Sequence, residues 1–190
     1  MTMQILAGRF RHRRLLSPPG SVSRPTLSRV RQALFNVLAP RMFASRFLDL
    51  YAGAGSVGLE AYSQGSQRVV LVESDRRILA ILRQNALALD PTGQEVQVLP
   101  ADAATAVRQL EARGERFEFI YLDPPYRSGV FAAWAGTADW AHLLAPHGWV
   151  ICQHERRDPL PATWAGCRLV REKAYGRTAL AFYACDAPDA

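Results

Sequence analysis

The tetrapeptide Asp123-Pro-Pro-Tyr126 holds residue types that suit chemistry on a nucleobase. The exocyclic amine of a base is a poor nucleophile because its lone pair is delocalised into the ring. The carboxylate of Asp123 and the carbonyl of Pro124 could accept hydrogen bonds from both N–H groups of such an amine. Pro124 and Pro125 would stiffen the backbone, and Tyr126 offers a ring on which a base could stack. The motif therefore predicts group transfer to a base amine, largely through positioning; taken alone, it also fits a proline-rich turn.

A glycine-rich segment provides a second candidate site. Gly53, Gly55 and Gly58 follow an apolar run and precede a helical pattern. Glycine at these positions lets the backbone turn sharply and lets a ligand approach a helix N-terminus closely. Glu73, 20 residues after Gly53, ends the next apolar run, where a carboxylate could accept hydrogen bonds from a ribose diol. This pattern fits NAD as well as it fits S-adenosylmethionine (AdoMet).

Asp49 favours AdoMet over NAD. It lies four residues before Gly53, where its carboxylate would repel a pyrophosphate but attract the amino and sulfonium charges of AdoMet. Asp102, after the third apolar run, could accept a hydrogen bond from the adenine amine, with the Ala103 N–H beside it, or could cap the next helix. The candidate cofactor contacts are Asp49, Tyr51, Gly53, Gly55, Gly58, Glu73, Ser74, Asp102, Ala103 and Asp123.

Alternating apolar and amphipathic segments must position these residues. The apolar segments predict strands over residues 46–51, 67–73, 95–99, 117–122 and 149–154. The amphipathic segments predict helices over residues 58–64, 76–89, 103–112 and 129–144. Two further strands, 168–174 and 178–183, form a predicted hairpin. The predicted fold is α/β, a Rossmann-like sheet of seven strands that is mostly parallel and ends in an antiparallel hairpin.

The N-terminal quarter of the chain is strongly basic. Residues 1–48 contain nine arginines and no Asp or Glu, although the whole chain carries a formal net charge of only +6. This asymmetry indicates a polyanionic partner. A short hairpin is predicted near the N-terminus, and residues 27–38 form a predicted amphipathic helix.

Length and composition exclude several classes of protein. The chain has 190 residues, of which 49% are hydrophobic, which is ordinary for a globular domain. No apolar run approaches the roughly 18 residues of a transmembrane helix, so no membrane association is expected. Three cysteines without Cys-x-x-Cys spacing argue against a disulfide framework and a zinc site. The four histidines also lack metal-ligand spacing, so we expect no metal. The cysteine usage indicates a reducing, cytoplasmic compartment.

Taken together, these motifs resemble the RsmD family of AdoMet-dependent methyltransferases, which methylate N2 of a guanine in small-subunit (16S) ribosomal RNA. The resemblance covers essentially the whole chain: the basic segment 8–15, the Arg-Pro-Thr segment 24–36, the glycine loop, residues 123–126 and the segment 171–178. The chain departs from the family at His12, where Gly is usual, at Ser28, where Asp is common, and at Gln32, where Glu is usual.

The resemblance implies roles for both ends of the chain. Residues 1–40 form a basic RNA-binding extension, and residues 41–186 form the methyltransferase domain. The catalytic residues are Asp123, Pro124, Pro125 and Tyr126, which would receive a flipped base. The RNA contacts are Arg9, Arg11, Arg13, Arg14, Arg24, Thr26, Arg29 and Arg31. The expected partner is 16S ribosomal RNA or a small-subunit assembly particle, bound by a monomeric enzyme.

Three alternative functions remain open from the sequence. An adenine-N6 methyltransferase acting on DNA or RNA would use the same Asp-Pro-Pro-Tyr chemistry, although 190 residues leave little room for a DNA target-recognition domain. An NAD-dependent oxidoreductase would not explain Asp49 or the tetrapeptide. A non-catalytic RNA-binding assembly module would not explain why the acidic residues at the predicted sites are all present.

Overall fold

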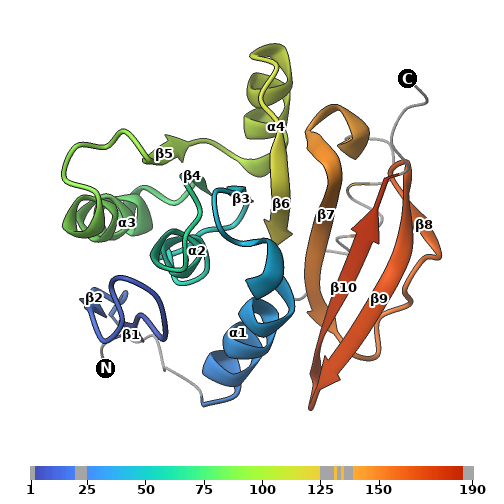
Figure 1. Cartoon of the computed structure of the whole chain (residues 1–190), viewed down its shortest axis with the longest axis horizontal. Coiled ribbons are helices and arrows are strands. Elements are labelled where there is room, and N and C mark those ends of the chain that lie inside the picture. The colour runs from blue at the N-terminus through green and yellow to red at the C-terminus, as the bar shows by residue number, and fades with distance from the viewer. Residues whose placement is uncertain (1–2, 20–24, 125–130, 132–133, 135–138, 186–190) are drawn as a thin grey trace. The chain divides into compact units, whose positions relative to one another are not determined.

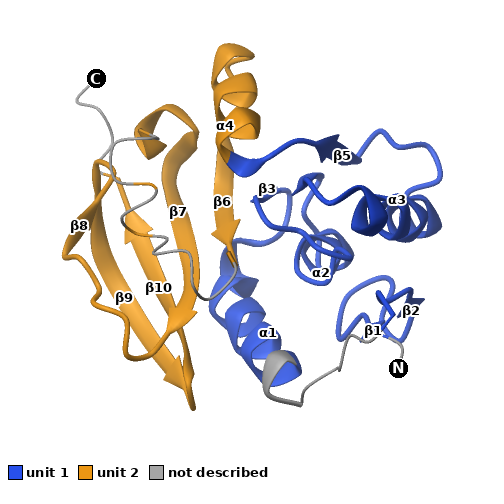
Figure 2. Cartoon of the chain, turned by 180° about the vertical axis from the view of Figure 1, so that it is seen from behind, with its two compact units in different colours: residues 1–103 blue, residues 104–190 orange. Residues whose placement is uncertain are grey.

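The computed structural model describes residues 3–19, 25–124, 131, 134 and 139–185 (Figure 1). The chain divides into two compact units, Met1–Ala103 (unit 1) and Ala104–Ala190 (unit 2), which Figure 2 colours blue and orange. The basic N-terminal segment therefore lies in the same compact unit as the glycine loop. The division at residue 40 into an RNA-binding extension and a methyltransferase domain stays a prediction about function.

Unit 1 contains three parallel strands in the order β5-β4-β3. They are β3 (Arg46–Asp49), β4 (Arg68–Glu73) and β5 (Val96–Pro100). The middle strand, β4, buries four consecutive apolar side chains completely, as a parallel strand covered on both faces does. Helices α2 (Gly58–Ser63) and α3 (Arg76–Leu89) pack against these strands. The carboxylate of Asp75 caps α3 by accepting a hydrogen bond from the Arg77 N–H at 2.8 Å.

The predicted N-terminal hairpin and helix are also present in unit 1. Strands β1 (Met3–Gln4) and β2 (Arg14–Leu15) form a two-stranded antiparallel sheet. Helix α1 (Pro25–Leu38) buries Val30, Leu34 and Leu38 at helical spacing and continues into the 3-10 turn η1 (Ala39–Arg41).

Unit 2 contains five strands in the order β6-β7-β10-β9-β8. Helix α4 (Ala103–Ala112) precedes β6 (Phe117–Leu122), which pairs in parallel with β7 (Leu144–Glu155). The remaining pairs are antiparallel and involve β8 (Thr163–Trp164), β9 (Cys167–Tyr175) and β10 (Thr178–Ala184). The seven predicted strands are confirmed, and the sequence analysis missed only the two-residue strand β8. Both units thus have the expected mixed α/β character.

The segment before β7 differs from the prediction of a helix over residues 129–144. Of its described residues, Phe131 and Trp134 are helical, and residues Trp140–His142 form the 3-10 turn η2. Strand β7 already begins at Leu144, five residues earlier than predicted. Pro146 lacks an N–H and favours extended backbone over a continued helix, which explains the early strand. The buried side chains of Trp140 and Trp164 pack here with ring centroids 5.6 Å apart, so these tryptophans belong to the core.

Cys167 and Cys185 form a disulfide in unit 2, which corrects the expectation drawn from the odd cysteine count. The register of the C-terminal hairpin explains the pairing. Arg168 of β9 lies opposite Ala184 of β10, so the next pair outward places the two cysteines opposite each other. Directly opposed residues of an antiparallel pair have neighbouring Cβ atoms, as a disulfide requires. Cys152 is buried as a free thiol.

None of the helices in the described ranges is long and apolar enough to cross a membrane.

Candidate cofactor and catalytic residues

The glycine loop follows the carboxyl end of β3 and combines tight packing with one open backbone position. Gly53 and Gly55 adopt φ angles of +54° and +91°, which disfavour other residues. A Cβ atom on Gly55 would lie 2.8 Å from Leu59 Cδ1, and one on Gly58 would overlap the side chain of Leu71. A Cβ atom on Gly53 would meet nothing within 4 Å. Gly55 and Gly58 thus allow the loop to pack, whereas the backbone of Gly53 faces open space that a ligand could enter.

Glu73 fastens the end of β4 to this loop. Its Oε2 accepts a hydrogen bond from the Gly53 N–H at 3.1 Å, and its Oε1 accepts from the N–H groups of Ser74 and Asp75 at 2.7 and 2.8 Å. An ionised carboxylate offers about four acceptor positions, so the three backbone donors orient the group and leave acceptor capacity. This is the carboxylate that the sequence assigns to the cofactor ribose.

Asp49 has a structural role that the sequence analysis did not predict. The side chain is buried, with 1% of the residue exposed, and its Oδ2 accepts a hydrogen bond from the Gly58 N–H at 3.1 Å. The carboxylate therefore joins the end of β3 to the start of α2, where the glycine loop ends. Its predicted attraction to the charges of AdoMet stays a prediction.

The remaining cofactor candidates follow the same three strands. In the register of unit 1, Asp49 lies opposite Leu71 and Glu73 lies opposite Pro100, so the carboxyl ends of β3, β4 and β5 share one edge. The candidates in the turns at this edge are the partly buried Tyr51, the exposed Ser74 and Asp102, and the buried Ala103. The edge fits AdoMet, because it combines an oriented carboxylate, an open backbone at Gly53 and an acidic residue after the third strand.

Asp123 follows β6 in unit 2 and is held by a residue that the sequence analysis missed. Its Oδ1 accepts a hydrogen bond from Gln153 Nε2 at 2.9 Å, and Gln153 Oε1 accepts one from the Tyr121 hydroxyl at 3.0 Å. Burial raises the pKa of Asp123 to about 7, and the hydrogen bond from Gln153 opposes this rise. Pro124 is buried, and the predicted residues Pro125 and Tyr126 lie outside the described residues. Gln153 could have been found only through the register that pairs β6 with β7.

The structure separates the predicted RNA contacts into different environments. Four exposed arginines of the hairpin and α1 are Arg11, Arg13, Arg14 and Arg29, and Arg9 of the hairpin is exposed as well. Arg31 is only 8% exposed, and its guanidinium donates to the Gln4 carbonyl at 2.7 Å and the Ser56 carbonyl at 3.2 Å. It also lies 3.8 Å from Glu60, so this guanidinium is engaged by partners within the protein and is not exposed to an RNA phosphate. Arg24 and the side chain of Thr26 lie outside the described part of the chain.

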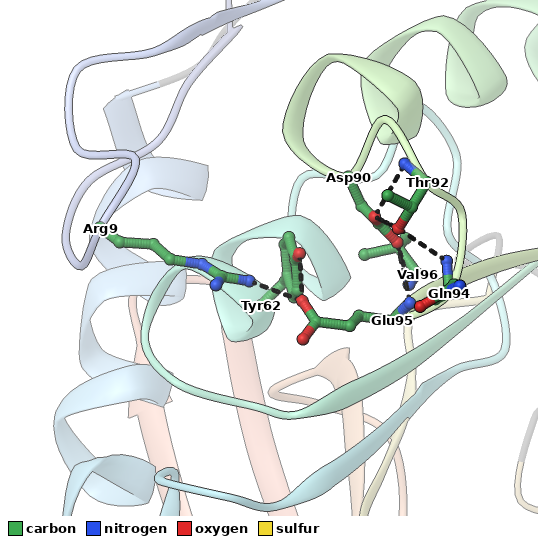
Figure 3. A network of polar contacts seen from close by, with 7 residues as sticks. All are labelled: Arg9, Tyr62, Asp90, Thr92, Gln94, Glu95 and Val96. Carbon is green, nitrogen blue, oxygen red and sulfur yellow. Dashed lines mark hydrogen bonds and ion pairs between the residues drawn. The ribbon is translucent and has the colours of Figure 1, made fainter.

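Arg9 is exposed but already has protein partners (Figure 3). Its guanidinium lies 3.1 Å from Glu95 Oε2 and 4.0 Å from the centre of the Tyr62 ring. The Tyr62 hydroxyl donates to the same oxygen at 2.5 Å, and burial together with this hydrogen bond raises the pKa of Tyr62. Asp90 Oδ2 accepts from the N–H groups of Glu95 and Val96, which fixes the loop that carries Glu95. Arg9 therefore anchors the hairpin to unit 1.

Two further polar side chains attach the N-terminal segment to unit 1. The amide of Asn85 accepts from the Leu16 N–H at 2.8 Å and donates to the carbonyls of Leu16 and Ala54, and Ala54 lies in the glycine loop. The carboxylate of Glu60 accepts from the N–H groups of Leu6 and Ala7 at 2.8 and 2.9 Å. Within the ranges that the structure describes, no three His, Cys, Asp or Glu side chains are grouped as metal ligands.

Comparison with known proteins identifies the family. Residues 3–184 match the family described as "Conserved hypothetical protein 95". The chain is 32% identical over 181 residues to the ribosomal RNA small subunit methyltransferase D of Escherichia coli K12. The aligned region covers 95% of this chain and 89% of that protein. It is 28% identical over 183 residues to the protein of the same name from Haemophilus influenzae, with 95% and 93% covered.

Solved structures agree with this assignment. The yhhF protein of Escherichia coli superimposes with a TM-score of 0.84 at 30% identity, over 99% of this chain and 100% of that one. The HI0767 protein of Haemophilus influenzae superimposes with a TM-score of 0.78 at 27% identity, over 96% and 98%. Because both the family match and these relatives extend over nearly the full length, the chain belongs to the family of ribosomal RNA small subunit methyltransferase D, the RsmD family.

Proposed function

We propose that this protein transfers a methyl group from AdoMet to the exocyclic N2 of a guanine in 16S ribosomal RNA. The observation that carries the proposal is Asp123, a carboxylate oriented by Gln153 at the end of β6 and followed directly by Pro124. A base amine needs such an acceptor, and a family of ribosomal RNA methyltransferases supplies the context.

In this proposal, unit 1 binds the methyl donor. AdoMet supplies an electrophilic methyl group on a sulfonium. The carboxylate of Glu73 accepts hydrogen bonds from the ribose hydroxyls, since the backbone of Gly53 and its own turn hold it in place. Asp102 and Ala103 bind the adenine, and the open backbone position at Gly53 lets the ligand approach the loop.

The residues after β6 act on the acceptor base. The ionised Asp123 carboxylate and the Pro124 carbonyl accept the two N–H groups of the amine, which directs its lone pair toward the methyl group. As the N–C bond forms and the S–C bond breaks, the nitrogen becomes positively charged and loses one proton. A carboxylate with a pKa of about 7 can take that proton near neutral pH.

The exposed arginines bind the substrate RNA through its phosphates. Arg11, Arg13 and Arg14 lie close together in sequence on the hairpin, and Arg29 lies on α1. Phosphate contacts position a nucleic acid without reading its sequence. The proposed substrate is 16S ribosomal RNA, naked or in a small-subunit assembly particle, which a monomeric enzyme would methylate in the cytoplasm.

The proposal is tested by incubating the protein with methyl-labelled AdoMet and, separately, unmodified 16S RNA, small ribosomal particles and DNA. We expect labelled N2-methylguanosine from RNA or particles, and a loss of about 100-fold or more in turnover for Asp123→Asn. Labelled N6-methyladenosine would establish the adenine-N6 alternative instead. Absence of label from all three substrates would contradict the proposed reaction.

A further inference from the structure

Gln153 is a buried amide that lies between two functional groups of unit 2. It belongs to β7, is 5% exposed, and forms hydrogen bonds with Tyr121 on one side and Asp123 on the other. The parallel register explains the contact, because Tyr121 lies opposite Ile151 and Leu122 lies opposite Cys152. The next position along both strands brings Asp123 beside Gln153.

The direction of the hydrogen bonds fixes the amide. An ionised carboxylate can only accept, so the group that faces Asp123 must be the NH₂ of Gln153. The Tyr121 hydroxyl, which is buried, then donates to the amide oxygen. Rotation of the amide by 180° would place its oxygen against the carboxylate, so the carboxylate fixes the orientation in which Gln153 donates, and the Tyr121 hydroxyl is compatible with it because it donates to the amide oxygen.

We propose that Gln153 is a positioning residue, which holds Asp123 Oδ1 and keeps the remaining acceptor positions of the carboxylate directed at the base amine. This inference rests on the proposed function, because it assigns Gln153 to the same methyl transfer. Gln153 touches neither substrate nor cofactor in this role, and it acts only through Asp123.

Among the residues that the structure describes, Gln153 is the side chain that donates a hydrogen bond to Asp123. Burial raises the pKa of Asp123, and this hydrogen bond lowers it. Cys152 of β7 is the neighbouring titratable group, and burial raises the pKa of its thiol, so the thiol stays neutral. Asp158 and Tyr183 interact electrostatically with Cys152. Loss of the Gln153 donor would therefore leave burial unopposed and raise the pKa of Asp123 further.

The test compares Gln153→Met, which has a similar volume but no donor, with the wild-type enzyme across pH. We expect kcat at pH 7 to fall by about tenfold or more, while KM for RNA and the affinity for AdoMet stay unchanged. The acidic limb of the pH–kcat profile should move up by about one pH unit, so that part of the activity returns at high pH. Tyr121→Phe should shift the limb in the same direction by less.

Tyr183→Phe is the matched control. It also removes a buried tyrosine hydroxyl, which donates to the Pro161 carbonyl at 2.9 Å, but within the described part of the chain this hydroxyl forms no hydrogen bond with Gln153 or Asp123. Its pH profile should match that of the wild type. The inference would be overturned if kcat and the acidic limb of the pH–kcat profile are unchanged in Gln153→Met. If that variant does not fold, an unshifted acidic limb in Tyr121→Phe would overturn the inference instead.

A second readout separates this inference from the proposed function. The carboxyl ¹³C resonance of Asp123 reports its ionisation without any turnover. A higher midpoint of this pH titration in Gln153→Met than in the wild type supports the control of Asp123 by Gln153. This holds even if the wild type yields no N2-methylguanosine, because in that case only the proposed reaction fails. An identical midpoint in both proteins would overturn the inference while the methyl-transfer assay stands.

Discussion

At the scale of single residues, Asp123 illustrates a conflict between stability and reactivity. Burial raises its pKa to about 7, so the folded protein holds the carboxyl proton more tightly than the unfolded chain does. Between about pH 4 and pH 7 the folded state therefore binds more protons, and the contribution of Asp123 to the free energy of unfolding falls as the pH rises. Above pH 7 the ionised carboxylate destabilises the fold.

The variant Asp123→Asn should remove this dependence. We expect it to be more stable than the wild type by about 1–3 kcal/mol at pH 8 and nearly equal to it at pH 4, because an amide has no charge to bury. Urea unfolding at both pH values measures the difference. A variant that is less stable than the wild type at pH 8 would show that the charge is not costly in this fold.

The backbone conformation of His12 lowers the stability of the folded protein. It adopts a φ of +71° in the hairpin, a region in which glycine is favoured. His12→Gly should therefore raise the free energy of unfolding by up to about 1 kcal/mol, part of which is offset by the entropy of glycine in the unfolded chain. Thermal unfolding of the wild type and of His12→Gly tests this expectation, with His142→Gly as a control at another exposed histidine. A melting temperature of His12→Gly below that of the wild type would contradict the expectation.

At the scale of elements, Asn85 joins α3 to both the N-terminal segment and the glycine loop. Its removal leaves the backbone groups of Leu16 and the Ala54 carbonyl without this partner. Unsatisfied buried groups of this kind cost about 1–3 kcal/mol. The same side chain therefore sets the stability of two segments that the proposed function assigns to RNA and AdoMet.

The variant Asn85→Ala should lower the free energy of unfolding by about 1–3 kcal/mol and speed amide hydrogen exchange at Leu16. Gln84→Ala, on the exposed side of the same helix, is the control and should change neither quantity. Unchanged exchange at Leu16 in Asn85→Ala would mean that other contacts suffice to hold the segment.

The elements were predicted more completely than the contacts between them. Helices α3 and α4 and strand β6 have the predicted bounds, because their apolar periodicity is uninterrupted. The same periodicity could not show that Arg31 is buried beside Glu60, since both residues lie on helices whose mutual contact is not local. Gln153 and the Cys167–Cys185 pair depended likewise on strand register, which hydrophobic patterns alone do not fix.

At the scale of the whole molecule, the distribution of charge predicts how RNA binding responds to salt. Nine arginines precede the first acidic residue, but Arg31 is buried and Arg9 pairs with Glu95. Apart from Arg9, the exposed arginines of the described N-terminal segment are Arg11, Arg13, Arg14 and Arg29. With roughly four phosphate contacts, the affinity for 16S RNA should fall by about 50–150-fold between 50 and 200 mM salt.

Binding titrations at several salt concentrations measure this slope. Arg13→Ala should reduce the slope of log affinity against log salt concentration by about the amount that one phosphate contact contributes. Arg108 is an exposed arginine on α4, and Arg108→Ala should leave this slope unchanged. An affinity independent of salt would show that the basic N-terminal segment does not bind phosphates.

The way in which the hairpin is held has a consequence for divergence within the family. Around Ser63, the hairpin is attached through its backbone: the Arg9 N–H donates to the Ser63 carbonyl at 2.8 Å and the Phe10 N–H to its hydroxyl at 3.0 Å. Gly8 approaches the same carbonyl so closely that any side chain would overlap it. Under the proposed function, attachment to the protein at this point and contact with RNA would therefore depend on different atoms. Outward-facing residues of the hairpin can be exchanged in evolution to suit a different RNA surface while the anchoring of the hairpin is preserved.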